Sequence, residues 1–132
     1  EREVSLNAAS LTRLSHAALR AMVPRHRGYL INVSSIAGFQ AAPGLAVYAA
    51  SKAYVTSLSE ALHAEVSAVG VHVTALCPGL TRTEFQRVSN TESYVDRFPG
   101  FAWSSVDSVA ETGLRAVTRG RVVSVPGAVP CP

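Results

Sequence analysis

The chain has 132 residues, enough for one hydrophobic core, so we expect a single domain. Hydrophobic residues make up 48% and charged residues 16%, a composition that excludes an intrinsically disordered chain. The net charge is only +3 and no basic run is interleaved with aromatic residues, so we expect no nucleic-acid partner.

The sequence predicts neither a metal site nor a membrane span. Cys77 and Cys131 are isolated, without a Cys-x-x-Cys motif or a histidine pair at metal-ligand spacing. We expect both to be reduced thiols in a cytoplasmic protein. No apolar run reaches the roughly 18 residues that a membrane-spanning helix needs.

The first half of the chain alternates helix and strand patterns. Apolar residues at helical spacing predict a helix over Leu6–Met22 that Pro24 ends. The β-rich run Tyr29–Val33 predicts a strand, and Ser34–Gly44 has the composition of a loop. Leu45–Val69 then predicts a long helix, closed by Gly70 at its C-cap.

The second half continues the alternation. Val71–Cys77 predicts a strand stopped by Pro78-Gly79, and Leu80–Gly100 reads as an irregular loop long enough to be functional. Ser104 and Asp107 resemble a capping box for a helix that runs to about Thr118. Arg121–Val125 predicts a third strand.

This order of elements predicts an α/β fold. Strands joined by helices form right-handed crossovers, which give a parallel sheet with helices on both faces. We therefore expect three parallel strands in a doubly wound, Rossmann-like arrangement.

Three segments of the chain converge on one edge of that sheet. Ser34 and Ser35 follow the first strand, and Pro78-Gly79 follows the second. Tyr48 and Lys52 lie in the first turns of the helix that joins the two strands, so they start from the same edge. Ligands of open parallel sheets bind just beyond the carboxyl ends of the strands, so we expect the site here.

Lys52 is the only lysine of the chain and follows Tyr48 by four residues. Residues at i and i+4 share one face of a helix. An ammonium beside a phenol favours the ionised phenol, which makes the tyrosine a usable proton donor and acceptor. A solvated lysine on a surface helix is the alternative interpretation.

Taken together, these motifs resemble the short-chain dehydrogenase/reductase family over nearly the whole chain. The similarity rests on Asn32-Val33-Ser34-Ser35, a serine 13 positions before the tyrosine, the Tyr48-x-x-x-Lys52 pair, and Pro78-Gly79 after the next strand. Leu6-Asn7 matches the place of the family's active-site asparagine. The segment from Arg121 to Gly127 resembles the family's last strand, and is similar to members that act on acyl or other hydrophobic carbonyl compounds.

The resemblance implies an NAD(P)-dependent oxidoreductase that interconverts a carbonyl and an alcohol by hydride transfer. Tyr48 would be the general acid and base, and Lys52 would assist it and hydrogen-bond the nicotinamide ribose. Ser35 would donate a hydrogen bond to the substrate carbonyl. Asn7 would hold a water that connects Lys52 to solvent.

The cofactor implied by the resemblance is NADP or NAD, with NADP slightly favoured because it is common in the family. Pro78 and Gly79 would let the backbone pass close to the nicotinamide. Thr83 would contact the carboxamide, and the backbone at Thr81 would help. The cofactor supplies the hydride, and the protein supplies orientation and proton management.

Some of these residues have a second interpretation. Ser34 is the rival of Ser35, although it falls at the wrong interval from Tyr48. Asn7 could be an ordinary polar residue on a helix face, and Thr81 could be a local backbone cap. The four histidines have no partners at useful spacing, so we expect structural or surface roles for them.

The chain departs from the family's pattern in one respect. No Gly-x-x-x-Gly-x-Gly and no Gly-x-Gly-x-x-Gly occurs, although the family begins with such a turn to hold the pyrophosphate. We therefore expect residues 1–132 to be the carboxyl-terminal part of a Rossmann-type domain. Alone, it would expose an unpaired strand edge, be marginally stable or prone to aggregation, and have negligible dehydrogenase activity.

Two functions from different classes follow. The first is the oxidoreductase, with a small carbonyl or alcohol as substrate. The second is a truncated, non-catalytic remnant that acts as an oligomerisation or structural module. The apolar helix over Leu45–Val69 suits burial against a second copy, and in the resembling family two long helices build a homo-oligomer. Both interpretations can hold together.

Overall fold

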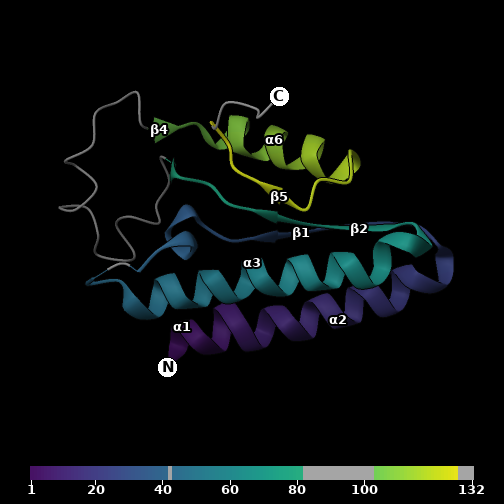
Figure 1. Ribbon diagram of the computed structural model, residues 1–132, viewed down its shortest axis with the longest axis horizontal. Coiled ribbons are helices and arrows are strands. Elements are labelled where there is room, and N and C mark those ends of the chain that lie inside the picture. Colours follow the sequence, from purple (N-terminus) through teal and green to yellow (C-terminus); the bar gives the residue numbers. More distant parts are fainter. Residues whose placement is uncertain (42, 82–102, 128–132) are drawn as a thin grey trace.

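The computed structural model describes residues 1–41, 43–81 and 103–127 (Figure 1). Its helices are α1 (Arg2–Val4), α2 (Leu11–Met22), α3 (Ala46–Val66) and α6 (Val106–Thr118), with a π-helical turn at Ser5–Ser10 between the first two. Its strands are β1 (Gly28–Val33), β2 (Val71–Leu76), β3 (Leu80–Thr81), β4 (Trp103–Ser104) and β5 (Val123–Ser124). Short 3-10 turns lie at Val23–Arg25, Ile36–Phe39 and Ser67–Val69.

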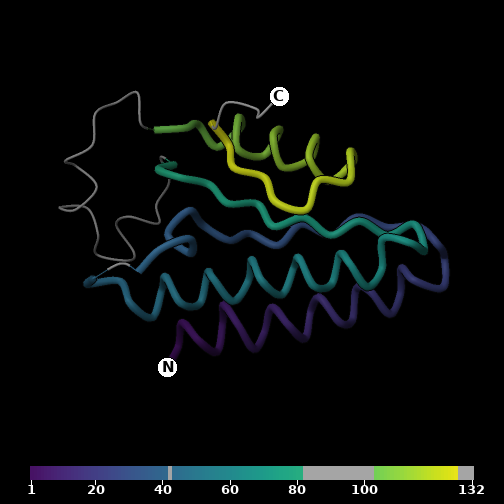
Figure 2. Tube along the Cα trace, in the orientation of Figure 1, coloured from purple at the N-terminus to yellow at the C-terminus, as the bar shows by residue number. Residues whose placement is uncertain are grey.

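The main sheet is parallel, in the order β1-β2-β5. Strands β1 and β2 pair along their whole length, from Gly28 opposite Val71 to Val33 opposite Leu76. Helices α2 and α3 lie side by side on one face, and α6 lies on the other (Figures 1 and 2). The expected α/β architecture, with three parallel strands and helices on both faces, is confirmed. Within the described ranges β1 pairs only with β2, and β3 and β4 form a separate parallel pair.

An apolar cluster fixes the end of α3 that lies away from the strands' carboxyl ends. Leu19 and Val66 pack from the helices onto Val71 and Val73, which are wholly buried in β2. Side chains along a strand alternate between its faces, so these two valines point to the same side. Apolar burial therefore joins α2 and α3 to the sheet here.

A small polar network lies within the same layer. The buried Asn32 on β1 donates from Nδ2 to Ser59 Oγ of α3 at 3.0 Å and to Ser15 Oγ of α2 at 3.3 Å. Both serines are also buried. Buried polar groups need partners, so this network sets how the two helices sit on the central strand.

Two tight turns meet where α2 and α3 end. Gly70 has φ +87°, and a Cβ on it would lie 2.4 Å from the backbone oxygen of His26. Glycine is required there for both reasons. Nearby, His63 Nδ1 lies 2.9 Å from the oxygen and 3.2 Å from the nitrogen of Val73, at an edge of β2 that β5 does not reach. This histidine is structural, as expected.

Several sequence-based boundaries were inexact at helix ends. The first predicted helix is interrupted by the π-helical turn, and Pro24 lies inside a 3-10 turn. The predicted C-cap Gly70 is confirmed in its left-handed conformation, although the α-helix ends at Val66 and a 3-10 turn follows. The predicted N-cap Ser104 is wrong: Ser104 lies in β4, and the Oγ of Ser105 accepts from Ser108 N at 3.1 Å.

The last strand is shorter than predicted, with only Val123 and Ser124 in register with β2. Most of the predicted loop over Leu80–Gly100 lies outside the described residues. Its first two residues form β3, which the sequence pattern did not reveal. In the parts of the chain that the structure describes, no helix is long and apolar enough to cross a bilayer.

Candidate active site

The three segments expected to converge are joined by hydrogen bonds. Ser34 N donates to Leu76 O at 2.7 Å and Ile36 N donates to Pro78 O at 3.1 Å, so the chain after β1 follows the chain after β2. Lys52 Nζ donates to Val33 O at 3.0 Å, which attaches the first turns of α3 to the same place. We call this edge, formed by residues 33–36, 48–52 and 76–79, the rim.

Tyr48 and Lys52 face each other on the first turns of α3. Lys52 Nζ lies 5.8 Å from the centroid of the Tyr48 ring, a distance at which a cation is attracted to an aromatic face. Both side chains are partly buried. The i, i+4 spacing thus places an ammonium against a phenol in a partly desolvated position, where charge interactions are stronger than in water.

Burial also acts on the lysine itself. Removing the ammonium from water lowers the pKa of Lys52 from its usual value of 10.5, and the nearby Cys77 opposes this more weakly. An ammonium has three N–H donors, and Val33 O takes one of them. Lys52 is therefore fixed in direction and still able to donate to a ligand.

The two neighbouring serines lie in different environments. Ser35 is partly exposed on the rim, and its Oγ accepts from Ala37 N at 3.1 Å, which leaves the hydroxyl proton able to donate. Ser34 is 2% exposed and points beneath the rim, where its Oγ donates to Lys52 O at 2.7 Å. Of the two serines, only Ser35 reaches the surface of the rim.

Asn7 lies in the π-helical turn and reaches α3 beside the Tyr48–Lys52 pair. Its Nδ2 donates to Ser51 Oγ at 3.2 Å, and Ser51 Oγ in turn donates to Tyr48 O at 2.8 Å. Single π-helical turns inside longer helices frequently occur at functional sites. Asn7 therefore contacts α3 at Ser51, the residue before Lys52.

The remaining predicted cofactor contacts follow β2. Pro78 and Gly79 follow Cys77 at the end of β2, and a Cβ on Gly79 would be 3.4 Å from Ile36 Cδ1, an ordinary contact distance. Thr81 lies in β3, with its Oγ1 donating weakly to Gly79 O at 3.4 Å. Thr83 lies outside the described residues.

Sequence reasoning missed the groups beneath the rim. The Val33 carbonyl, Thr56 and Cys77 all contact Lys52 or its immediate partners. Thr56 had a signal, because it follows Lys52 by four residues and so lies on the same face of α3. The carbonyl had none, since a backbone acceptor leaves no trace in a sequence.

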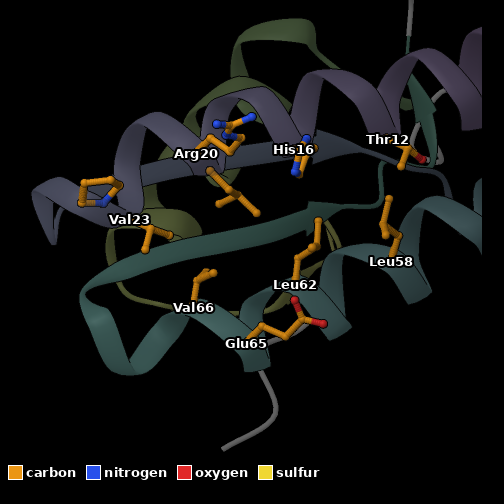
Figure 3. A pocket seen from close by; sticks show the side chains of 10 residues that line it. Thr12, His16, Arg20, Val23, Leu58, Leu62, Glu65 and Val66 are labelled. Atoms are coloured by element: carbon orange, nitrogen blue, oxygen red, sulfur yellow. The ribbon is translucent and has the colours of Figure 1, made fainter.

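A separate apolar groove lies between α2 and α3, away from the rim (Figure 3). It has a volume of about 510 Å³. Its walls carry the side chains of Thr12, His16, Leu19, Arg20, Val23, Leu58, Leu62, Glu65 and Val66, together with Pro24. The polar side chains among these residues are those of Thr12, His16, Arg20 and Glu65.

Residues 1–93 match the family model of the short chain dehydrogenases. The chain belongs to this family. The match includes the rim, α2, α3, β1 and β2, and it confirms the resemblance drawn from the motifs.

Two curated relatives show how far the similarity extends. An uncharacterized oxidoreductase of Myxococcus xanthus is 37% identical over 111 residues, which cover 83% of this chain and 41% of the relative. The very-long-chain 3-oxoacyl-CoA reductase of Mus musculus is 29% identical over 120 residues, covering 91% of this chain and 38% of the relative. This dehydrogenase-family chain spans less than half the length of either protein.

A solved structure agrees with the fold. The short-chain dehydrogenase from Sphingobium yanoikuyae in complex with NADPH matches with a TM-score of 0.83 and 30% sequence identity. The match covers 96% of this chain and 48% of that one. The relationship to oxidoreductases of this fold therefore rests on both sequence and structure.

Proposed function

We propose that this chain carries the proton-transfer site of an NAD(P)-dependent oxidoreductase that interconverts a carbonyl and an alcohol. One observation carries the proposal: Ser35, Tyr48 and Lys52 come from two segments and lie on one rim of the parallel sheet, with Lys52 held by Val33 O. A proton donor, a cation beside it and a carbonyl-directed hydroxyl are the groups that carbonyl reduction needs.

The proton chemistry follows from the positions of these groups. Tyr48 gives its phenolic proton to the substrate oxygen in reduction and takes it back in oxidation. Lys52 stabilises the phenolate that remains, because its ammonium lies over the same ring. Ser35 donates to the substrate oxygen while negative charge builds up there. Asn7, joined to α3 through Ser51, is the residue we assign to a solvent relay toward Lys52.

A nicotinamide cofactor fits the donors that the rim presents. Lys52 has N–H donors beyond the one that Val33 O accepts, which suits the hydroxyls of a ribose. After Pro78, Gly79 presents backbone without a side chain beside Ile36. When bound, NADP or NAD supplies the hydride. The Sphingobium yanoikuyae neighbour with NADPH favours NADP, and we assign Thr81 and Thr83 to the nicotinamide end.

The glycine-rich phosphate-binding turn is absent from the 132 residues, and the match covers about half of the NADPH-bound neighbour. We therefore propose that residues 1–132 work as the carboxyl-terminal part of a Rossmann-type domain whose other part holds the pyrophosphate. On its own the chain is expected to turn over no detectable substrate. We place the protein in the cytoplasm.

The substrate class that we favour is a hydrophobic carbonyl compound. The resemblance of the Arg121–Gly127 segment to acyl-directed members supports it. So does the similarity to a protein named very-long-chain 3-oxoacyl-CoA reductase.

The second candidate is a non-catalytic module that assembles through its helices. The outer face of α2 and α3 supports it, because Leu14 is 71% exposed, Tyr54 is 42% exposed and an apolar groove runs between the helices. A homo-oligomer through this face suits the enzyme as well. Because both candidate functions allow a homo-oligomer, only a test of catalysis at the rim distinguishes the oxidoreductase from the non-catalytic module.

A fusion protein distinguishes them. Residues 1–132 are joined behind the glycine-rich part of the Sphingobium yanoikuyae dehydrogenase, and NADPH oxidation is followed with ketones, aldehydes and 3-oxoacyl thioesters. We expect carbonyl-dependent turnover, and none from the 132-residue chain alone. A folded fusion that binds NADPH, measured by its fluorescence, and reduces no carbonyl compound would contradict the enzyme and favour the module.

A further inference from the structure

Beneath the rim, Lys52 is held from both ends by two consecutive residues of the chain. Val33 O accepts a hydrogen bond from Lys52 Nζ at 3.0 Å. Ser34 Oγ donates to Lys52 O at 2.7 Å. The dipeptide Val33-Ser34 at the end of β1 thus bonds both the ammonium and the backbone carbonyl of the same lysine.

The Ser34 hydroxyl belongs to a buried polar cluster. It lies 2.7 Å from Thr56 Oγ1, whose single proton can go to Ser34 Oγ or to Lys52 O at 3.2 Å. Thr56 Oγ1 also lies 3.8 Å from the Sγ of Cys77, the residue that follows β2. Ser34 is 2% exposed, Thr56 7% and Cys77 0%. The cluster therefore links the ends of β1 and β2 to the first turns of α3, the same three segments that form the rim.

Close backbone packing next to the cluster limits movement further. A Cβ on Gly38 would lie 2.8 Å from the carbonyl carbon of Lys52 and 2.7 Å from Ala53 N. The turn after Ser35 therefore lies directly against the lysine's backbone, and only glycine fits there. Packing and the Ser34 hydroxyl hold the Lys52 carbonyl on this side, while Val33 O fixes the direction of the ammonium on the rim.

We propose that Ser34 is a positioning residue for Lys52, acting through the buried Ser34–Thr56–Cys77 cluster, while its neighbour Ser35 faces the substrate. This deepens the proposed function, and its bearing on catalysis rests on the role assigned to Lys52 there. The Ser34 hydroxyl touches no ligand in this proposal. It orients Lys52 because a hydrogen bond fixes direction, which apolar packing alone does not.

The physical consequence is specific to the lysine. Without the Ser34 hydroxyl, the end of β1 is no longer fixed to the backbone of α3, and the Nζ to Val33 O hydrogen bond loosens. The ammonium then gains water. Because burial lowers the pKa of Lys52, added hydration moves that pKa back up toward 10.5.

Lys52 is the only lysine, so one labelled side chain reports on it alone. The 132-residue chain is produced with 13C-lysine, and the ε-carbon resonance is followed against pH for the wild type, Ser34→Ala, Thr56→Val and Ser35→Ala. We expect Lys52 to titrate at higher pH in Ser34→Ala, to shift less in Thr56→Val, and to stay at the wild-type value in Ser35→Ala. The rate at which acetic anhydride modifies Lys52, measured by mass spectrometry, should follow the same order.

A folded Ser34→Ala chain with the wild-type titration would overturn the proposal, as would an equal shift in Ser35→Ala. If circular dichroism shows that Ser34→Ala is unfolded, Thr56→Val carries the test, and an unchanged titration in that folded variant contradicts the cluster's role. The titration needs no substrate, cofactor or turnover. A failed activity assay with a shifted Lys52 would therefore reject the proposed function and leave the positioning role standing.

Discussion

The two ends of helix α3 are attached to the sheet by different means. At its start, on the rim, hydrogen bonds hold it: Lys52 bonds Val33 O through Nζ and accepts from Ser34 Oγ. At its end, Val66 packs with Leu19 onto Val71 and Val73 in an apolar cluster. The same helix is therefore held by directional hydrogen bonds at its start and by apolar packing at its end.

The difference suits the function that we propose for the rim. Apolar packing is non-directional and mainly contributes stability. A proton donor needs an orientation, which hydrogen bonds with defined angles supply. We expect substitutions at the packed end to change the free energy of unfolding, and substitutions on the rim to act mainly on chemistry. Four predictions test this contrast, from the largest expected effect on stability to the smallest.

Gly70→Ala should have the largest effect, at the packed end. A Cβ there meets His26 O at 2.4 Å, and the residue would also keep φ +87°. We expect a loss of about 3 kcal/mol in the free energy of unfolding, measured by urea denaturation.

Gly44→Ala is the matched control for Gly70→Ala. Gly44 has φ +86° and lies just before α3 begins, with no atom within 4 Å of the added Cβ. Only backbone strain then remains, about 1 kcal/mol. Equal losses in the two variants would show that the turn at His26 is not tightly packed.

Val73→Ala should cost about 2 kcal/mol, because a fully buried side chain loses two methyl groups and leaves a cavity. Leu14→Ala is the control, since Leu14 on α2 is 71% exposed. Thermal unfolding of both variants gives the comparison. If Val73→Ala were as stable as Leu14→Ala, the apolar cluster would not be what holds this end of α3.

Cys77, beneath the rim, should make stability depend on pH. Burial raises the pKa of the thiol above 9.0, and smaller effects of Thr56 and Ser34 oppose it. The neutral thiol therefore contributes fully to the free energy of unfolding below pH 9.0. This contribution is lost as the pH rises through the higher pKa of the thiol in the folded state. From about pH 8 to about pH 10, wild-type stability should fall more than that of Cys77→Ala in matched urea titrations. Parallel curves would contradict this.

The smallest effect belongs to α6. Arg115 Nη2 bonds Glu111 Oε1 at 2.6 Å, but the two side chains are 58% and 70% exposed. Exposed i, i+4 ion pairs contribute about 0.3–0.5 kcal/mol. Arg115→Gln should therefore change the thermal midpoint by no more than a degree or two, with added salt reducing the difference further. A larger loss would mean that α6 depends on this pair.

Much of the fold could be predicted because its signals are local. The helical run before Gly70 and the β-rich runs around Tyr29–Val33 and Val71–Cys77 predicted the parallel sheet and the edge at which the rim lies. The π-helical turn around Asn7 was not visible, since it changes hydrogen bonding without changing apolar spacing. The N-cap was displaced from Ser104 to Ser105 because pairing of β4 with β3 takes Ser104 into a strand.

The candidate site divides in the same way. Side-chain identities and spacing pointed to Ser35, Tyr48 and Lys52. The sequence placed Ser34 as a rival of Ser35, and the structure separates the two by burial, with Ser34 at 2% exposure. What orients Lys52 is a backbone carbonyl and a hydroxyl from another segment, and contacts of that kind depend on the tertiary fold rather than on spacing.

The central claim is that the rim performs proton transfer while the packed end supplies stability. It is tested most directly by carbonyl-dependent NADPH oxidation in the fusion protein, wild type against Tyr48→Phe. We predict that Tyr48→Phe lowers turnover by about 10²–10⁴-fold, the typical contribution of a general acid, with the thermal midpoint unchanged. Turnover that stays at the wild-type rate in a folded Tyr48→Phe protein would contradict the account.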